Sequence, residues 1–321
     1  MKAMRAHQFG GPDQLKLEDA PEPQAQAGQV IIRVRAAGIN PADLVRLSGR
    51  LGSLPLPYIP GTDVCGEVES LGAGVSNLKR GQRVFGRALT GGYAEKTCLA
   101  AEEAVPLPAN LSFDEGAAIP IPFYTAYHGL HNKAAMKSGE SVLVSAGGGG
   151  VGVAAIQLAR LAGARVITTV GSREKAERVA ALGAHVAVNY KEQDFVAEVQ
   201  KFTDNKGIDV IIENVAADNL AKDFLAAALR ARIVVIGTGT GKAGDASFPV
   251  FAALMKDVTM LGMSLINAGA AITEMARVLS GLFSEGKLKA VVSKSYPLPD
   301  APQALADLVA AKVFGKLVLT P

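Results

Sequence analysis

The sequence predicts an α/β protein that combines a β-rich unit with a doubly wound parallel sheet. From about residue 140 to 285, apolar runs alternate with helical stretches, and consecutive parallel strands need such crossovers. From residue 1 to about 120, the apolar pattern changes every few residues and is interrupted by Gly and Pro, as is typical of short strands and turns. A length of 321 residues allows two domains.

Six apolar runs are expected to form the parallel sheet, because strands buried on both faces have this composition. They are "SVLVSA", "RVITTV", "HVAVNY", "IDVIIENV", "RIVVIG" and "VTMLGMSL". In the helical stretch "VGVAAIQLARLAG", Val151, Ala155, Leu158 and Ala162 fall on one face, and Gly163 is placed to end the helix. The tail, from "KAVVSKSYPLPD" to "FGKLVLTP", returns to β character, so we expect it to rejoin the first domain.

Composition excludes several classes of protein. No apolar run reaches the roughly 18 residues of a membrane span, and the start "MKAMRAHQFGG" lacks the apolar core of a secretion signal, so we expect a cytoplasmic protein. The net charge of +3 comes from dispersed residues, which argues against a nucleic-acid partner. Cys65 and Cys98 are too few for a disulfide framework or a four-thiolate zinc site.

The segment "SAGGGGVGVAAIQLAR" contains a dinucleotide-binding fingerprint between a predicted strand and a predicted helix. Gly147 would make the tight turn, Gly149 would leave room for a pyrophosphate, and Gly152 would let helix and strand pack closely. The free N–H groups at the helix start would face the phosphates. A merely flexible glycine loop is the alternative, which the flanking strand and helix disfavour.

The next strand lacks the acid that holds the ribose 2′-hydroxyl in NAD-preferring sites, about 20 residues after the loop. Ser172 follows that strand, and Arg173 and Lys175 come directly after it. Charge-assisted hydrogen bonds contribute about 1.5–3 kcal/mol each, so these groups predict a preference for NADPH over NADH of at least about tenfold. Two alternatives remain: both cations are solvated surface charges, or Glu174 is the ribose acid.

Motifs along the whole chain resemble those of the quinone oxidoreductase (zeta-crystallin-like) branch of the medium-chain dehydrogenase/reductase superfamily. They are "FGGPDQLKLED", "AAGINPADLVRLSG", "PYIPGTDVCGEVESLG", "GGYAEKTCLA", "GAAIPIPFYTAYHGL", "SAGGGGVGVAAIQLA" and "KGIDVIIENVA". The resemblance implies a GroES-like catalytic domain (residues 1–121 and 286–321) and a Rossmann domain (residues 122–285). It also implies NADPH as cofactor, a homodimer or homotetramer, and reduction of quinones or activated alkenes.

Zinc-dependent members of the superfamily have a Cys where Asn40 stands and a His where Thr62 stands. Neither Asn nor Thr is a usual zinc ligand, so the resemblance implies hydride transfer without a metal. His128 and His131 could share a helix face as ligands, although satisfied or exposed histidines are the favoured interpretation.

The resemblance places Asn40 beside the nicotinamide and the substrate, where its amide could donate to a carbonyl oxygen. The alternative is an Asn that only forms a turn. Several relatives carry a Tyr in this motif where this chain has Val45, so Tyr58 is the candidate substitute, with a packed Tyr as its alternative. Asp43 is expected to orient the loop or to cap a helix.

Further cofactor contacts are expected by resemblance at helix starts and strand ends, where core, cap or sheet-edge roles are the alternatives. Tyr190 would lie beside the 2′-phosphate with Lys175. The remaining candidates are Thr125, Gly150, Val151, Asn214, Gly237 and Ser264.

The predicted function is NADPH-dependent, zinc-independent hydride transfer to a quinone or a related conjugated carbonyl. Reduction of an alkenal, an enone or an acryloyl thioester is the close alternative. An NADPH-binding structural or RNA-binding protein is a distant one, which the intact glycine motif and the dispersed charges disfavour.

Overall fold

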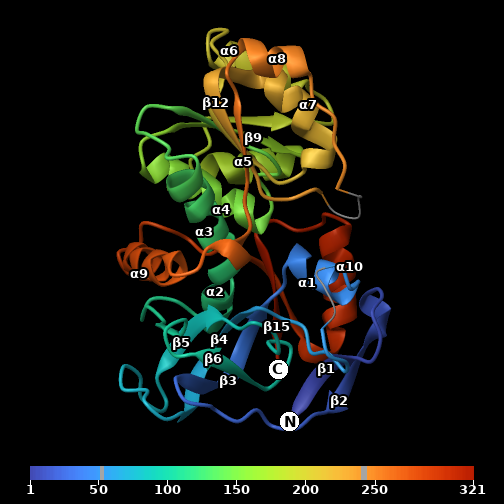
Figure 1. Cartoon of the computed structure of the whole chain (residues 1–321), viewed down its shortest axis with the longest axis vertical. Helices are drawn as coiled ribbons and strands as arrows, with labels where there is room; N and C mark the ends of the chain where they lie inside the picture. The colour runs from blue at the N-terminus through green and yellow to red at the C-terminus, as the bar shows by residue number, and fades with distance from the viewer. Residues whose placement is uncertain (51–53, 240–243) are drawn as a thin grey trace. The chain divides into compact units, whose positions relative to one another are not determined.

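A computed structural model of the chain describes residues 1–50, 54–239 and 244–321. The chain forms two compact units, one of Met1–Ile121 with Ala270–Pro321 and one of Pro122–Gly269 (Figure 1). The first boundary lies where the sequence predicts it. The second lies at Gly269 and not at residue 285, because helix α9 (Ala271–Ser284) packs within the first unit, where Asn110 Nδ2 donates to the carbonyl of Phe283 at 3.1 Å.

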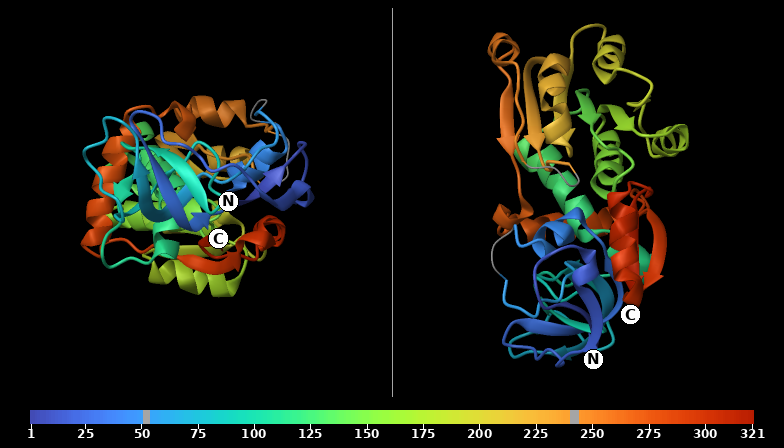
Figure 2. Two further views of the ribbon diagram at one scale, coloured as in Figure 1. Left: turned by 90° about the horizontal axis from the view of Figure 1, so that it is seen from below. Right: turned by 90° about the vertical axis from the view of Figure 1, so that its right-hand side faces the viewer.

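The first unit is built on a mostly antiparallel sheet in the order β14-β15-β3-β4-β5-β7, with β6 also paired to β3. Strands β1 and β2 form a separate hairpin, and α10 packs against β14 and β15 (Figure 2). The strands are β1 (Lys2–Ala6), β2 (Leu15–Asp19), β3 (Gln29–Gly38), β4 (Asp63–Leu71), β5 (Arg83–Arg87), β6 (Lys96–Ala100), β7 (Val105–Pro106), β14 (Val292–Pro297) and β15 (Lys316–Thr320). The helices are α1 (Pro41–Leu47), α2 (Phe113–Ala117), α9 and α10 (Ala301–Val309). The tail therefore rejoins the first unit, as predicted.

The pairing of β15, β3 and β4 brings together segments that are distant in the sequence. Gly38, at the end of β3, is in register with Val318 on one side and with Asp63 on the other. A Cβ atom on Gly38 would lie 2.8 Å from Cε of Lys316 and 2.2 Å from the carbonyl oxygen of Ala117. Only glycine therefore lets the lysine side chain pass over the strand end.

The second unit is a parallel sheet in the order β10-β9-β8-β11-β12-β13, and its strands are those predicted from the apolar runs. They are β8 (Ser141–Val144), β9 (Arg165–Val170), β10 (Val186–Asn189), β11 (Ile208–Glu213), β12 (Ala227–Val235) and β13 (Thr259–Gly262). The helices are α3 (Pro120–Tyr127), which begins at the unit boundary, α4 (Gly150–Leu161), α5 (Arg173–Ala181), α6 (Phe195–Phe202), α7 (Ala216–Ala226) and α8 (Val250–Met255). This order reverses between β8 and β11, which is the switch point where doubly wound sheets bind ligands.

Helix α4 follows directly from the glycine loop and is buried along most of its length. It ends as predicted, because Ala162 caps it and Gly163 takes the left-handed conformation with φ of +84°. Among the described helices, none is long and apolar enough to cross a membrane.

Candidate active site

Asn40 lies in a buried polar network of the first unit. Its Nδ2 donates to Oδ2 of Asp63 at 2.9 Å, and Nζ of Lys316 donates to the same carboxylate oxygen at 2.8 Å. Lys316 also donates to Oδ1 of Asn40. All three side chains are almost completely buried, so water screens their charges only weakly.

The charged pair determines which way the Asn40 amide points. A flipped amide would turn its N–H groups toward the ammonium of Lys316 and its oxygen toward the carboxylate of Asp63, and both contacts would be repulsive. In the observed orientation, one Nδ2 hydrogen is used by Asp63, and the other has no acceptor among the described residues. Asn40 can therefore offer one N–H to a ligand.

Asp43 supports Asn40 from within α1. Its Oδ2 accepts the backbone N–H of Asn40 at 2.8 Å and the hydroxyl of Tyr93 at 2.9 Å, in agreement with the orienting role predicted for it. Burial raises the pKa of Asp43 to about 6, and the two hydrogen bonds and the charge of Lys316 oppose that rise. The neighbours of the Asp43 carboxyl group thus fix its position, and burial makes it a weaker acid than an exposed Asp.

Tyr58 lies close to this network and is 3% exposed, and its hydroxyl has no hydrogen-bond partner in the described part of the chain. Burial raises the pKa of Tyr58, and so does the charge of Asp43, whereas Arg46 and Thr90 lower it. The hydroxyl therefore remains protonated and can donate. Val45, which replaces the Tyr of several relatives, is half-exposed.

Asn40 and Thr62 stand at the two positions discussed above as zinc-ligand positions. Asn40 hydrogen-bonds to Asp63, which follows Thr62 directly in the sequence. The Thr62 hydroxyl accepts a hydrogen bond from Nη1 of Arg46 at 3.1 Å. The ammonium of Lys316 already neutralises Asp63, so this donor set does not fit a zinc ion. Across the described ranges, no three His, Cys, Asp or Glu side chains gather as metal ligands.

His128 and His131, which are three residues apart in the sequence, each contact another side chain. Nδ1 of His128 lies 3.0 Å from Nδ2 of Asn132, and the ring of His131 lies 4.5 Å from that of Tyr127. His128 thus has a hydrogen-bond partner, and His131 has a ring contact.

The glycine loop of the second unit has room for few side chains. A Cβ atom on Gly147 would lie 2.0 Å from Oγ1 of Thr168, and one on Gly152 would lie 2.4 Å from the carbonyl oxygen of Ala146. A Cβ atom on Gly149, by contrast, would meet nothing closer than 3.4 Å. Packing therefore requires glycine at positions 147 and 152, whereas Gly149 is exposed and a Cβ atom there would make only an ordinary contact.

Hydrogen bonds join the loops that follow β8 and β11 at the switch point. Oγ of Ser145 accepts the backbone N–H of Asn214 at 2.7 Å and donates to Oε1 of Glu213 at 2.8 Å. Nδ2 of Asn214 donates to the carbonyl of Ser145 at 2.9 Å. A Cβ atom on Gly237 would lie 2.6 Å from the carbonyl oxygen of Asn214, so the loop after β12 packs against the loop after β11.

A second polar group gathers where β9 and β10 end. A Cβ atom on Gly171 would lie 2.8 Å from the hydroxyl of Tyr190, so the phenol ring covers this glycine. Ser172 caps α5 by accepting the backbone N–H of Lys175 at 3.2 Å. Burial lowers the pKa of Lys175, the charge of Glu174 raises it, and the charge of Lys191 lowers it.

The remaining predicted residues are placed as follows. Arg173 forms an exposed ion pair with Glu177 at 3.2 Å, which points it along α5. Thr125 is buried within α3, and Ser264 accepts the backbone N–H of Ile266 at 3.3 Å. The residues Gly150 and Val151 form the first turn of α4, where backbone N–H groups lack helical acceptors.

Sequence reasoning missed the charged members of both groups. Asp63 and Lys316 meet only through strand pairing across 253 residues, so no local spacing could reveal them. Ser145 and Glu213 stand at the ends of two predicted strands, and that position was a usable signal. Lys191 follows Tyr190 directly and could have been included with it.

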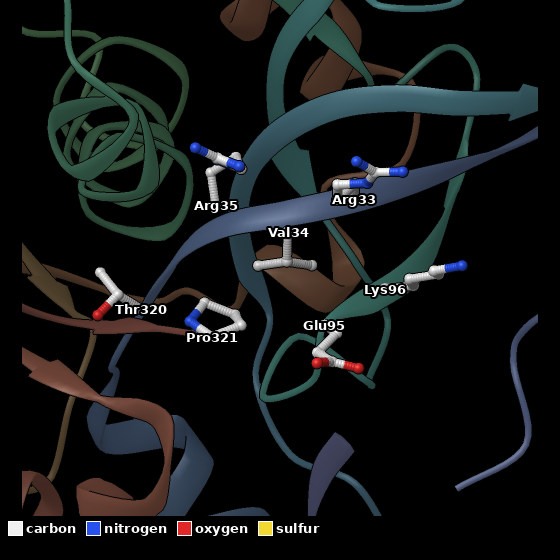
Figure 3. A pocket seen from close by; sticks show the side chains of 7 residues that line it. All are labelled: Arg33, Val34, Arg35, Glu95, Lys96, Thr320 and Pro321. Atoms are coloured by element: carbon white, nitrogen blue, oxygen red, sulfur yellow. The ribbon is translucent and has the colours of Figure 1, made fainter. Parts of the chain in front are cut away.

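A hollow of about 530 Å³ lies elsewhere on the first unit, and it does not include the predicted site residues (Figure 3). The cations that line it already have partners in the protein. Arg33 and Lys96 form ion pairs with Glu69 at 3.2 and 2.8 Å, and the guanidinium of Arg35 lies over the ring of Phe113. The lining residues are Arg33, Val34, Arg35, Glu95, Lys96, Thr320 and Pro321.

Two family models match the chain, namely the alcohol dehydrogenase GroES-like domain over residues 26–109 and the zinc-binding dehydrogenase over residues 150–281. Together with the two folds, they define a medium-chain dehydrogenase/reductase, a class of oxidoreductases. Rat and human quinone oxidoreductases are 38% and 37% identical to the chain, with 99% of this chain and 97% of each relative covered. The chain belongs to the quinone oxidoreductase (zeta-crystallin-like) family.

Solved structures of this class share the fold over the whole chain. The structure of Escherichia coli quinone oxidoreductase complexed with NADPH has a TM-score of 0.92 at 29% identity, with 100% of both chains covered. An NAD-dependent alcohol dehydrogenase has the same score and coverage at 34% identity. The CurK enoyl reductase has a TM-score of 0.89 at 28% identity, covering 99% of this chain and 98% of its own.

Proposed function

We propose that the protein is an NADPH-dependent oxidoreductase that transfers hydride to a quinone or a related conjugated carbonyl. The observation that carries the proposal is the exposed Gly149 at the N-cap of α4, next to the free N–H groups of that helix and at the switch point of the sheet. The E. coli quinone oxidoreductase, whose fold the chain shares, was solved with NADPH. The reduced nicotinamide supplies the hydride when it is bound.

Asn40 is proposed to polarise the acceptor without a metal. Its free Nδ2 hydrogen would donate to the carbonyl oxygen, which gains negative charge as the hydride arrives. Lys316 and Asp63 hold the amide in this orientation. A neutral hydrogen bond stabilises such charge less than a Lewis acid does, so the site suits acceptors that are already electron-poor. The proton that completes the reduction comes from Tyr58 or from water.

A variant of Gly149 tests the cofactor site. Gly149→Ala places a methyl group on the exposed side of the loop, 3.4 Å from the carbonyl oxygen of Ala146, and because φ at this residue is −81°, the backbone tolerates the change. We expect a folded protein whose Kd for NADPH rises at least about tenfold, or about 1.4 kcal/mol. Gly281→Ala is the matched control, since a Cβ atom there meets no atom within 4 Å. Nicotinamide fluorescence measures binding, and a wild type that binds no NADPH would contradict the enzyme proposal.

The preference for NADPH over NADH is proposed to rest on Tyr190, Ser172 and Lys175, with Lys191 as an added cation. Lys175→Gln should lower the ratio of kcat/KM for NADPH to that for NADH at least about tenfold, because it removes one charge-assisted bond. Lys201→Gln, which removes an exposed cation on α6, is the control. Equal kcat/KM for the two cofactors in the wild type would refute the preference.

The class of acceptor is decided by turnover. NADPH oxidation with 1,4-benzoquinone or 9,10-phenanthrenequinone, without oxidation by enones, supports a quinone reductase. Faster reduction of an enone or an acryloyl thioester would support the alternative, which the similarity to the CurK enoyl reductase favours. Single-wavelength absorbance of the reduced nicotinamide follows both reactions under the same conditions.

A homodimer is proposed to form through β13, and a homotetramer is the alternative. Within the described residues, β13 pairs only with β12, which leaves its other edge open. Met260 on this strand is exposed, as are four apolar residues of α8, namely Val250, Phe251, Leu254 and Met255. An open strand edge beside an apolar patch is suited to pairing with a second copy.

A further inference from the structure

Arg46 is a cation of the first unit whose hydrogen bonds, within the described residues, go to neutral oxygens. Its Nη1 donates to the Thr62 hydroxyl at 3.1 Å and to the carbonyl oxygen of Leu89 at 2.7 Å. Among the described residues, no Asp or Glu forms an ion pair with it, and the acid on the same helix, Asp43, faces Asn40 and Tyr93 instead. The remaining N–H groups of this half-buried guanidinium are therefore available to a ligand.

The hydroxyl of Tyr58 provides a second polar group next to Arg46. It is buried without a partner in the described ranges, and leaving such a group unsatisfied costs free energy. Both Arg46 and the Thr90 hydroxyl lie close enough to affect the titration of Tyr58. A ligand oxygen placed here would satisfy Tyr58 and neutralise Arg46 at once.

Apolar surface borders these donors. The side chain of Leu89, whose carbonyl binds Arg46, is 79% exposed, and that of Val45, the neighbour of Arg46 in α1, is 37% exposed. A flat apolar body could lie against these side chains while a polar group reaches the guanidinium. The corner thus combines the two requirements of an amphiphilic aromatic ligand.

We propose that Arg46 and Tyr58 form a recognition site for an anionic oxygen group, such as a carboxylate or sulfonate, carried by an aromatic ligand. The planar guanidinium fork matches the geometry of such a group and can bind two of its oxygens. Neither nearby carboxylate forms an ion pair with Arg46, because Asp63 pairs with Lys316 and the Asp43 carboxyl accepts hydrogen bonds from Asn40 and Tyr93. If the ligand is the acceptor of the proposed reaction, Arg46 determines its specificity.

Binding of a non-reducible probe tests the site apart from catalysis. Naphthalene-2-sulfonate and the neutral naphthalene-2-sulfonamide have the same apolar body, and calorimetry measures both Kd values. We expect the wild type to bind the sulfonate at least about tenfold more tightly, as a charge-assisted pair of bonds would give. Arg46→Gln should abolish this difference, Arg46→Lys should keep part of it, and Tyr58→Phe should reduce it severalfold.

Arg33→Gln is the control, because it removes an exposed cation of the same unit that pairs with Glu69. Equal affinities for the two probes in the wild type, or an equal loss in Arg33→Gln and Arg46→Gln, would overturn the proposal. Circular dichroism shows that each variant is folded.

Steady-state kinetics with a charged and a neutral quinone distinguish a failure of the Arg46 site from a failure of the proposed function. The ratio of kcat/KM for 1,2-naphthoquinone-4-sulfonate to that for 1,2-naphthoquinone should fall about tenfold in Arg46→Gln, with turnover of the neutral quinone retained. Turnover with an unchanged ratio would refute the role of Arg46 in acceptor choice and leave the proposed function intact. Sulfonate binding that depends on Arg46, in a protein that reduces no quinone, would refute the function and leave the binding site intact.

Discussion

Replacing Lys316 by Met should destabilise the first unit strongly. The substitution keeps an unbranched side chain, one atom shorter, but removes the ammonium that lies 2.8 Å from Oδ2 of Asp63. The carboxylate, which is completely buried, would then keep only the N–H groups of Asn40 and Ile121, both at 2.9 Å. Removing one partner of a buried pair costs about 3–5 kcal/mol. Because two donors remain, we expect a loss of about 3 kcal/mol in the free energy of unfolding.

The double variant Lys316→Met with Asp63→Asn separates the pair from its surroundings. Without either charge, the loss should be smaller than the sum of the two single losses by at least about 2 kcal/mol, because no unpaired charge stays buried. Arg33→Gln, which breaks an exposed ion pair, should cost less than about 1 kcal/mol.

Urea unfolding followed by far-ultraviolet circular dichroism measures these differences, since the chain contains no Trp for fluorescence. The two units can unfold separately, so the transition assigned to the first unit is the one to compare. A free energy of unfolding for Lys316→Met within about 1 kcal/mol of the wild-type value would refute the role given to the buried pair.

Three further predictions concern other parts of the chain. Because the pKa of Asp43 is raised to about 6 in the folded state, that state binds the proton more tightly than the unfolded one, and stability should fall as pH rises from about 4 to 6, by about 3 kcal/mol in total. Asp43→Asn should remove this dependence, and identical pH profiles for the two proteins would contradict it. Tyr58→Phe should lower the free energy of unfolding by no more than about 0.5 kcal/mol, or raise it, because the buried hydroxyl has no partner to lose within the described residues; a loss above about 1 kcal/mol would reveal a hydrogen bond there. If the proposed dimer forms, Met260→Lys should convert it to monomers in light scattering, whereas Leu17→Lys on the first unit should not, and a dimer that survives Met260→Lys would exclude the β13 edge.

The parallel sheet was predictable because its evidence is local. Each strand is an apolar run, and each crossover shows the helical period, so a short window of sequence contains the whole signal. The end of α4 was equally local, since Gly163 has a conformation that glycine adopts most readily. The place of α9 was not, because an amphipathic helix shows which of its faces is buried but not which unit it packs against.

The candidate site was predictable in its motifs but not in its charges. Asn40 and the glycine loop stand in short patterns with a known spacing. Lys316 meets Asn40 across 276 residues, and it does so only because β15 pairs with β3. Arg46 likewise meets Thr62 and Leu89 through the fold, so its isolation from carboxylates cannot be deduced from α1 alone.

In the first unit, different residues would polarise the acceptor carbonyl and select an anionic ligand. Asp63 and Lys316 neutralise each other, so their net effect is to orient the amide of Asn40 as a neutral donor. Arg46 is neutralised by no described carboxylate, so its charge is left to act on whatever enters the corner beside Tyr58. A neutral donor polarises a carbonyl without selecting for a charge, whereas an unpaired cation selects strongly for an anion. Reaction and selection would therefore depend on different residues, and variants of Arg46 should alter the choice of ligand while Asn40 keeps its orientation.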